Sequence, residues 1–187
     1  MLSERDGSRI GRIVVDGERI ERRVRELGAE ITRDYSGRSP IFVGVLKGAF
    51  LFMSDLAKQV ELPLRFDFMA VSSYGSATKT SGVVRIMKDL DHEIADEDVI
   101  VIDDIIDSGL TLNYLLRYLR ARGPASVEVC ALFSKEGRQR VEIPVRYRGF
   151  RIGPEFVVGY GLDFEERYRN LPYLAVLADG DVEPQRR

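Results

Sequence analysis

Three carboxylates stand close together in the stretch V-I-V-I-D-D-I-I-D-S-G-L-T-L, residues 99–112. Asp103 and Asp104 are adjacent, and Asp107 directly precedes a Ser-Gly-Leu-Thr turn. Carboxylate oxygens bind ribose hydroxyls and Mg²⁺, whereas backbone N–H groups at the start of a helix bind phosphate. An acid pair beside such a turn therefore predicts a pocket for a phosphorylated ribose.

The turn after Asp107 has the residue types that a phosphate site needs. Gly109 has no Cβ to obstruct a phosphate that approaches the backbone, and Ser108 and Thr111 add hydroxyl donors. The chain has neither the G-x-x-x-x-G-K-[ST] pattern of a P-loop nor the G-x-G-x-x-G pattern of a dinucleotide site. The turn thus indicates a phosphate site of another kind.

The elements around this turn alternate between strands and helices. The apolar run before Asp103 is typical of a buried strand in a parallel sheet, whose carboxyl end is where open α/β folds bind ligands. Helices are expected after Asp16, over residues 49–60 and from the turn to Arg122. This alternation predicts an α/β fold with a mostly parallel sheet flanked by helices. Further strands are expected at residues 41–46, 65–72, 83–87, 127–133, 156–160 and 174–177.

The whole chain sets broader limits on function. Its 187 residues predict a single domain, 1–187, and a net charge of −2 gives no reason to expect a nucleic-acid partner. Cys130 and His92 are the only residues of their types, so a zinc cluster or a Cys/His dyad is not indicated. No apolar run approaches the length of a membrane span, and Met1 to Asp6 lack a signal-peptide core, which predicts a cytoplasmic protein without membrane contact.

The stretch at 99–112 resembles the ribosyl-diphosphate signature of type I phosphoribosyltransferases, and more narrowly that of hypoxanthine-guanine phosphoribosyltransferases. The resemblance extends over residues 10 to 178. It implies the type I phosphoribosyltransferase fold, with a core at about 37–150 and a small hood subdomain from about 1–36 and 151–187, assembled as a homodimer or homotetramer. The other matching segments are V-L-K-G at 45–48, S-Y-G at 73–75, F-S-K at 133–135, F-V-V-G-Y-G-L-D at 156–163 and Y-R-N-L-P-Y at 168–173.

The resemblance implies how 5-phosphoribosyl 1-diphosphate is bound. Asp103 and Asp104 hold the ribose hydroxyls and, directly or through water, Mg²⁺; the family usually has Glu-Asp here, so Asp103 is one methylene shorter. The Leu46–Lys47 peptide is often cis in the family. The 5′-phosphate lies in the loop of Asp107, Ser108, Gly109, Leu110 and Thr111, and the pyrophosphate faces Lys47, Gly48 and Arg169.

The resemblance also implies how the purine is read. Asp107 takes the N7 proton as N9 bonds to the anomeric carbon, and Lys135 donates to the 6-oxo oxygen. Phe156 stacks on the base, while the backbone of Val157 reads N1 and the 2-position. Asp163 lies at the purine subsite and binds a second Mg²⁺. The loop at 73–82, which begins with Ser73 and Tyr74, is the lid.

The implied reaction is Mg²⁺-dependent transfer of phosphoribose to hypoxanthine or guanine, which gives IMP or GMP and pyrophosphate in purine salvage. Lysine has only donors, so adenine with its 6-amino group is expected to be rejected. Two alternatives stay open. One is a xanthine-preferring transferase. The other is an RNA-binding regulator of pyrimidine genes on the same fold, which often has an Asp-Asp pair but typically no acid at the position of Asp107.

Overall fold

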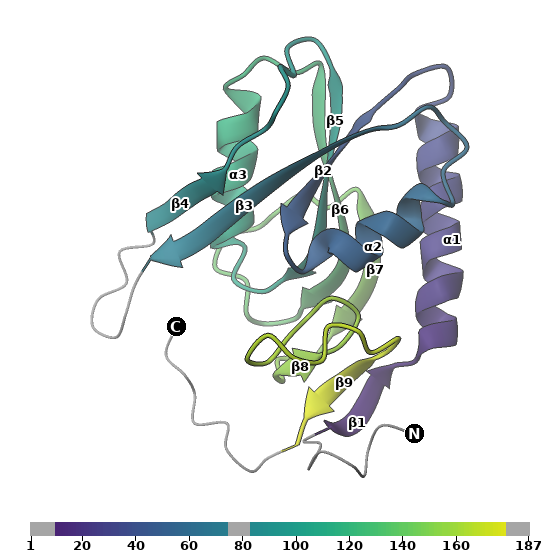
Figure 1. Cartoon of the computed structure of the whole chain (residues 1–187), viewed down its shortest axis with the longest axis vertical. Helices are drawn as coiled ribbons and strands as arrows, with labels where there is room; N and C mark the ends of the chain where they lie inside the picture. Colours follow the sequence, from purple (N-terminus) through teal and green to yellow (C-terminus); the bar gives the residue numbers. More distant parts are fainter. Residues whose placement is uncertain (1–9, 75–82, 179–187) are drawn as a thin grey trace.

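A computed structural model describes residues 10–74 and 83–178 of the chain, and it has two sheets (Figure 1). The larger sheet has six strands in the order β4-β3-β2-β5-β6-β7; β4 is antiparallel to β3, and the other neighbours are parallel. The predicted α/β fold with a mostly parallel sheet is therefore confirmed. The strands are β2 (Ile41–Leu46), β3 (Arg65–Tyr74), β4 (Val83–Lys88), β5 (Asp98–Ile106), β6 (Ser126–Lys135) and β7 (Tyr147–Ile152).

Three helices cover the two faces of the larger sheet. Apolar residues of α1 (Gly17–Asp34) and α2 (Ala49–Ala57) share one buried cluster with alternate residues of the strands. The other alternate residues pack with α3 (Leu110–Arg120). The helix α1 begins where the Asp16 carboxylate accepts a hydrogen bond from Arg19 N at 2.9 Å. Its buried residues follow the predicted helical spacing: Ile20, Val24, Leu27 and Ile31.

The central position of β5 explains why the functional residues meet. Residues 99–102 are fully buried, and Ile102 lies opposite Gly44 of β2 and Cys130 of β6. Because these strands are parallel, their carboxyl ends meet at one edge. Lys47 follows β2, Asp107 follows β5, and Lys135 ends β6. The sheet therefore brings a lysine, an acid and a second lysine to the same edge.

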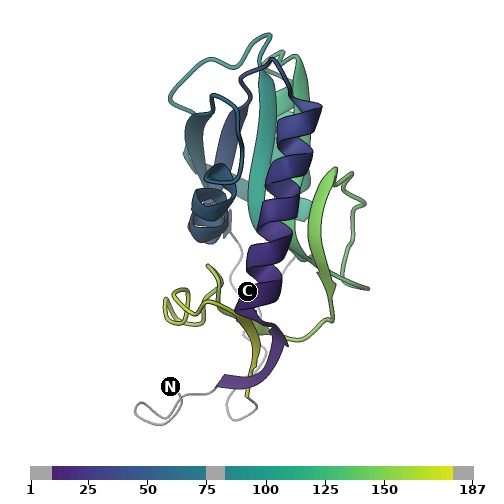
Figure 2. The same ribbon diagram turned by 90° about the vertical axis from the view of Figure 1, so that its right-hand side faces the viewer.

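The smaller sheet, in the order β1-β9-β8, lies beyond this edge (Figures 1 and 2). It contains β1 (Ile10–Val15), β8 (Val157–Val158) and β9 (Leu174–Leu177). Strands β1 and β9 pair antiparallel, so distant parts of the chain build it together. The helix α1 follows β1 of the smaller sheet, but it packs against β7 of the larger sheet and against α2.

The structure differs from the sequence expectations at several points. Strands β1 and β7 were not predicted, and the expected strand at 156–160 is reduced to the two residues of β8. Ser73 and Tyr74 form the end of β3, while residues 75–82 of the predicted lid lie outside the described residues. Within the described ranges, no helix is both long and apolar enough to cross a bilayer.

Candidate active site

The end of β5 and the loops that contain Gly48 and Gly161 meet tightly at Gly48. The Leu46–Lys47 peptide before it is cis, and Gly48 begins α2. A Cβ on Gly48 would overlap the Asp104 carboxylate, and a Cβ on Gly161, where φ is +98°, would overlap the Gly48 carbonyl oxygen. Glycine is therefore required at both positions. The predicted ribose and pyrophosphate residues are thus packed into one site.

The acid pair at the end of β5 is largely surrounded by protein. Asp104 is buried, and its Oδ1 accepts a hydrogen bond from Ile105 N at 2.9 Å. Burial raises the pKa of Asp103 well above its ordinary value, and the adjacent Asp104 charge raises that pKa further. Burial also raises the pKa of Asp104, against an opposing effect of the Arg169 charge. Two such carboxylates favour cations or hydroxyl donors as ligands.

Asp107 lies between two cations. Lys135 Nζ is 3.1 Å from Asp107 Oδ2, and Arg138 Nε is 3.0 Å from Oδ1. The Lys135 side chain is only 8% exposed, whereas that of Asp107 is 41% exposed. Arg138 Nη1 also donates to the Pro154 carbonyl oxygen at 3.5 Å. A buried ammonium and an accessible carboxylate thus stand side by side, and Arg138 links them to the segment that leads into β8.

The loop after Asp107, which leads into α3, is held in place by residues 140 and 141. Gly109 has φ +79°, and a Cβ there would lie 2.8 Å from the Val141 carbonyl oxygen. The Ser108 carbonyl oxygen accepts from Arg140 N at 2.9 Å, and Ser108 Oγ accepts from Leu110 N at 3.4 Å. The first turn of α3, which includes Thr111, presents N–H groups that have no carbonyl partner within the helix. The loop therefore has the geometry of an anion site.

Arg169 and Asp163, both between β8 and β9, pair with each other. Arg169 Nη2 lies 2.8 Å from Asp163 Oδ1, and Nη1 donates to the Gly161 carbonyl oxygen at 2.8 Å. Glu166 joins the cluster, with Oε2 3.0 Å from Lys47 Nζ and Oε1 3.4 Å from Arg169 Nη2. Arg169 Nε is buried and has no hydrogen-bond partner among the described residues. The charge of this guanidinium acts on Asp104 of the acid pair.

Phe156 and Val157 contribute from the region of the smaller sheet. Phe156 is 43% exposed, and its ring meets the Phe164 ring edge-on at 6.0 Å and 84°. Val157 is buried in β8 and pairs with Val176. Phe156 therefore offers a free aromatic surface, whereas Val157 can offer only its backbone.

The carboxylates predicted to bind Mg²⁺ do not form one cluster. Across residues 10–74 and 83–178, no three His, Cys, Asp or Glu side chains gather as a metal site. Asp103 and Asp104 are adjacent, but Asp163 is paired with Arg169. Mg²⁺ is commonly held by one or two carboxylates together with substrate phosphates and water. The oxygen donors of the acid pair fit that kind of ion.

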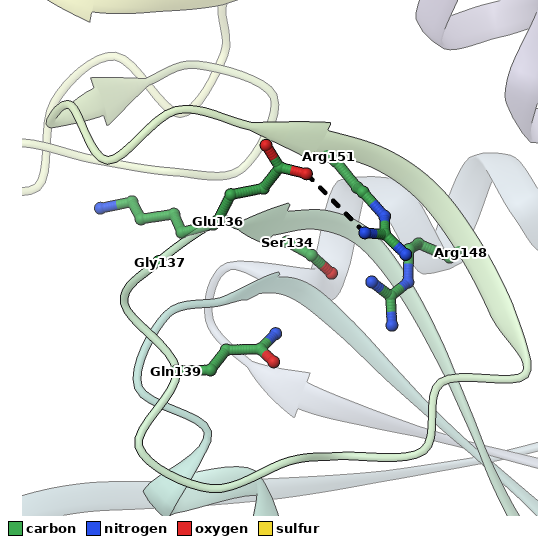
Figure 3. A pocket seen from close by; sticks show the side chains of 7 residues that line it. Ser134, Glu136, Gly137, Gln139, Arg148 and Arg151 are labelled. Carbon is green, nitrogen blue, oxygen red and sulfur yellow. Dashed lines mark ion pairs between the residues drawn. The ribbon is translucent and has the colours of Figure 1, made fainter.

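A separate cavity of about 310 Å³ lies where β6 and β7 end (Figure 3). Two charged residues of its lining pair with each other, with Arg151 Nη1 3.8 Å from Glu136 Oε1. Of the predicted site residues, only Lys135 contributes to the lining. The cavity is thus distinct from the acid pair and the anion loop. Its lining is Ser134, Lys135, Glu136, Gly137, Gln139, Arg148 and Arg151.

Comparison with known proteins agrees with this arrangement. The family model of the phosphoribosyl transferase domain matches residues 12–165. The chain belongs to the phosphoribosyltransferase family, as the resemblance of its motifs indicated.

Within this family, the chain is similar to hypoxanthine and hypoxanthine-guanine phosphoribosyltransferases. The hypoxanthine-guanine phosphoribosyltransferase of Bacillus subtilis (strain 168) is 48% identical over 168 residues, which are 90% of this chain and 93% of the relative. The bifunctional protein TilS/HprT of Listeria monocytogenes serotype 4b (strain F2365) is 50% identical over 90% of this chain. This chain spans about a quarter (26%) of the length of that bifunctional protein. A crystal structure of a Staphylococcus aureus hypoxanthine phosphoribosyltransferase superposes with a TM-score of 0.86, at 43% identity, and covers 90% of this chain and 91% of that one.

Sequence reasoning missed two residues that contact the predicted ones, Arg138 and Glu166. Both are charged residues in loops that follow matched motifs, but neither belongs to such a motif. Their partners, Asp107 and Lys47, lie 31 and 119 positions away along the chain. Only the folded arrangement brings these charges together.

Proposed function

We propose that the chain transfers phosphoribose from 5-phosphoribosyl 1-diphosphate to N9 of hypoxanthine or guanine, giving IMP or GMP and pyrophosphate in purine salvage. The observation that carries the proposal is the 3.1 Å contact between Lys135 and Asp107. In 6-oxopurines, O6 and N7 lie next to each other on one edge of the base. An ammonium beside a carboxylate matches an O6 acceptor beside an N7–H donor.

The base specificity follows from the same pair. Lys135 is buried and can only donate, so a 6-amino group would leave two donors facing each other without an acceptor. A site built for hydrogen bonding rejects such an analogue by about 10⁴- to 10⁵-fold. The exposed ring of Phe156 supplies a stacking surface, and the Val157 backbone is proposed to read N1 and the 2-position.

The phosphoribosyl group is proposed to lie across the carboxyl ends of β2 and β5. The 5′-phosphate binds the loop from Asp107 to Thr111 at the start of α3. The ribose hydroxyls bind Asp103 and Asp104, and the pyrophosphate faces Lys47 and Arg169. In this arrangement, the anomeric carbon lies between the leaving group and a base held against Asp107, so the site acts first by orientation.

The bond changes balance without a further reactant. The N9 lone pair forms the bond to the anomeric carbon as the bond to the pyrophosphate oxygen breaks, and the N7 proton passes to Asp107. Such a positioned base contributes about 10²- to 10⁴-fold to a rate. Lys47 and Arg169 stabilise the charge that develops on pyrophosphate.

Mg²⁺ is proposed as the cofactor, held by Asp103 and Asp104 and, on the pyrophosphate side, by Asp163. When bound, it neutralises the charge of the diphosphate and so makes pyrophosphate a better leaving group. Two features support the assignment: oxygen-only donors suit Mg²⁺, and burial of two adjacent carboxylates calls for a cation. The division into core and hood is proposed as well, since Asp107 directly follows a strand of the larger sheet and Phe156 directly precedes a strand of the smaller one.

The test is nucleotide formation by the full chain with 5-phosphoribosyl 1-diphosphate and Mg²⁺, with hypoxanthine, guanine, xanthine and adenine compared. We expect IMP and GMP, and release of pyrophosphate in equal amount. Xanthine as the preferred base would support the xanthine alternative instead. Tight binding of RNA without any base transfer would support the regulator of pyrimidine genes.

A further inference from the structure

A glutamate outside the matched motifs bridges the two cations that are proposed to bind pyrophosphate. Glu166 Oε2 lies 3.0 Å from Lys47 Nζ, and Oε1 lies 3.4 Å from Arg169 Nη2. Lys47 follows β2, whereas Arg169 belongs to the loop between β8 and β9. The Glu166 carboxylate is therefore an anion held between two cations from separate parts of the fold.

The backbone around Glu166 is shaped to maintain this contact. Glu165 and Glu166 have φ values of +51° and +62°, in the left-handed region that residues with a Cβ rarely occupy. Glu166 N donates to Asp163 Oδ2 at 2.9 Å, and the other oxygen of Asp163 pairs with Arg169. Such conformations persist when the surrounding structure fixes them. Asp163 thus anchors the turn that carries Glu166 toward Lys47.

The charges in this cluster cancel. Lys47 and Arg169 supply two positive charges, and Asp163 and Glu166 supply two negative charges. The Lys47 ammonium lowers the pKa of Glu166, so its carboxylate is ionised at neutral pH. A diphosphate that engages Lys47 and Arg169 would meet the Glu166 charge at the same two groups. Because like charges repel, the Glu166 carboxylate and the diphosphate do not bind Lys47 and Arg169 at the same time.

We propose that the Glu166 carboxylate competes with pyrophosphate for Lys47 and Arg169. The inference rests on the proposed function, because that function assigns pyrophosphate to these two cations. Glu166 holds both side chains in place and is exchanged for phosphate oxygens when the diphosphate binds. It therefore weakens the binding of pyrophosphate and speeds its release as a product. Glu166 acts here as a positioning residue that the ligand must displace.

The neighbouring Glu165 provides a matched control. It lies in the same turn, is exposed and has a similar left-handed backbone, but no contact of its carboxylate with Lys47 or Arg169 occurs in the structure. Glu165→Gln and Glu166→Gln thus change the net charge equally. Only Glu166→Gln removes the competing anion.

The experiment is isothermal titration of the full chain with inorganic pyrophosphate and Mg²⁺ at two salt concentrations. Exposed ion pairs contribute about 0.2 to 1 kcal/mol each, so loss of two competing pairs predicts tighter binding by about 2- to 30-fold for Glu166→Gln. This gain should shrink at high salt. Glu165→Gln should bind pyrophosphate like the native chain.

Two results would overturn the inference. Equal or weaker binding by Glu166→Gln would mean that the carboxylate only orients Lys47, and an equal gain in Glu165→Gln would mean that net charge alone acts. The base-transfer assay distinguishes failure of the competition by Glu166 from failure of the proposed function. A native chain that forms IMP while Glu166→Gln shows no gain contradicts only the competition. A native chain that neither forms nucleotide nor binds pyrophosphate contradicts both proposals.

Discussion

Lys135 Nζ, at the end of β6, lies 3.1 Å from Oδ2 of Asp107, which directly follows β5. The pairing follows from the register, in which Ile106 lies opposite Ser134 where β5 and β6 end. One member is a buried donor, and the other is an accessible acceptor. The two together present a hydrogen-bonding pattern that fits one edge of a 6-oxopurine.

Replacement of Asp107 by asparagine should remove the proton acceptor while it keeps the size of the side chain. We expect kcat with hypoxanthine to fall by about 10²- to 10⁴-fold, because a positioned base contributes that much. Steady-state kinetics measure this effect. Glu142→Gln, at an exposed acid, is the control. A kcat within a factor of two of the native value would exclude Asp107 as the base.

Replacement of Asp103 by asparagine should stabilise the chain at neutral pH. The pKa of Asp103 is raised in the folded chain, so the folded state binds more protons than the unfolded state above about pH 4. The native chain therefore loses stability as pH rises through this window, and Asp103→Asn does not. Thermal unfolding in a buffer with a chelator should show a higher midpoint for Asp103→Asn at pH 7 and a smaller difference near pH 4. A difference that is constant with pH would contradict the raised pKa.

Replacement of Gly161 by alanine should damage both stability and activity. The new Cβ would overlap the Gly48 carbonyl oxygen, and the φ of Gly161 is +98°. We therefore expect the free energy of unfolding to fall by about 2 to 4 kcal/mol. Gly37→Ala is the matched control, because Gly37 also has a positive φ but has nothing within 4 Å of a Cβ. That change should cost about 1 to 2 kcal/mol and leave kcat unchanged. Equal losses in urea unfolding would mean that the contact at Gly48 is unimportant.

The sequence predicts the central strands well because their pattern is local. The buried run before Asp103 and the capping Asp16 each act through neighbouring residues, and both are found as expected. The strand β7 was missed because Arg148, Gly149 and Arg151 interrupt its apolar pattern at an edge of the sheet. The strand β1 was missed because it depends on pairing with β9 at the other end of the chain.

Some residues of the candidate site could be predicted from the sequence, and others could not. Asp107 could be selected because it lies between a buried strand and a Ser-Gly-Leu-Thr turn, and Lys135 through the resemblance of the segment F-S-K at 133–135 to the family. Arg138 and Glu166 could not, since their importance lies in ion pairs that span the fold. Local pattern thus predicts which groups reach the carboxyl edge of the sheet. It does not predict which opposite charge each group meets there.

The most direct measurement is the ratio of kcat/KM for hypoxanthine to kcat/KM for adenine, in the native chain and in Lys135→Met. We expect a native ratio of about 10⁴ or more. Lys135→Met should lower kcat/KM for hypoxanthine by about 10- to 150-fold, because a hydrogen bond to a charged group contributes about 1.5 to 3 kcal/mol, and should reduce the ratio. Lys58→Met, at an exposed lysine paired with Asp55, should leave the ratio unchanged. A native chain that uses adenine as well as hypoxanthine, or a ratio that is the same in Lys135→Met, would contradict the assignment of the Lys135–Asp107 pair to the purine edge.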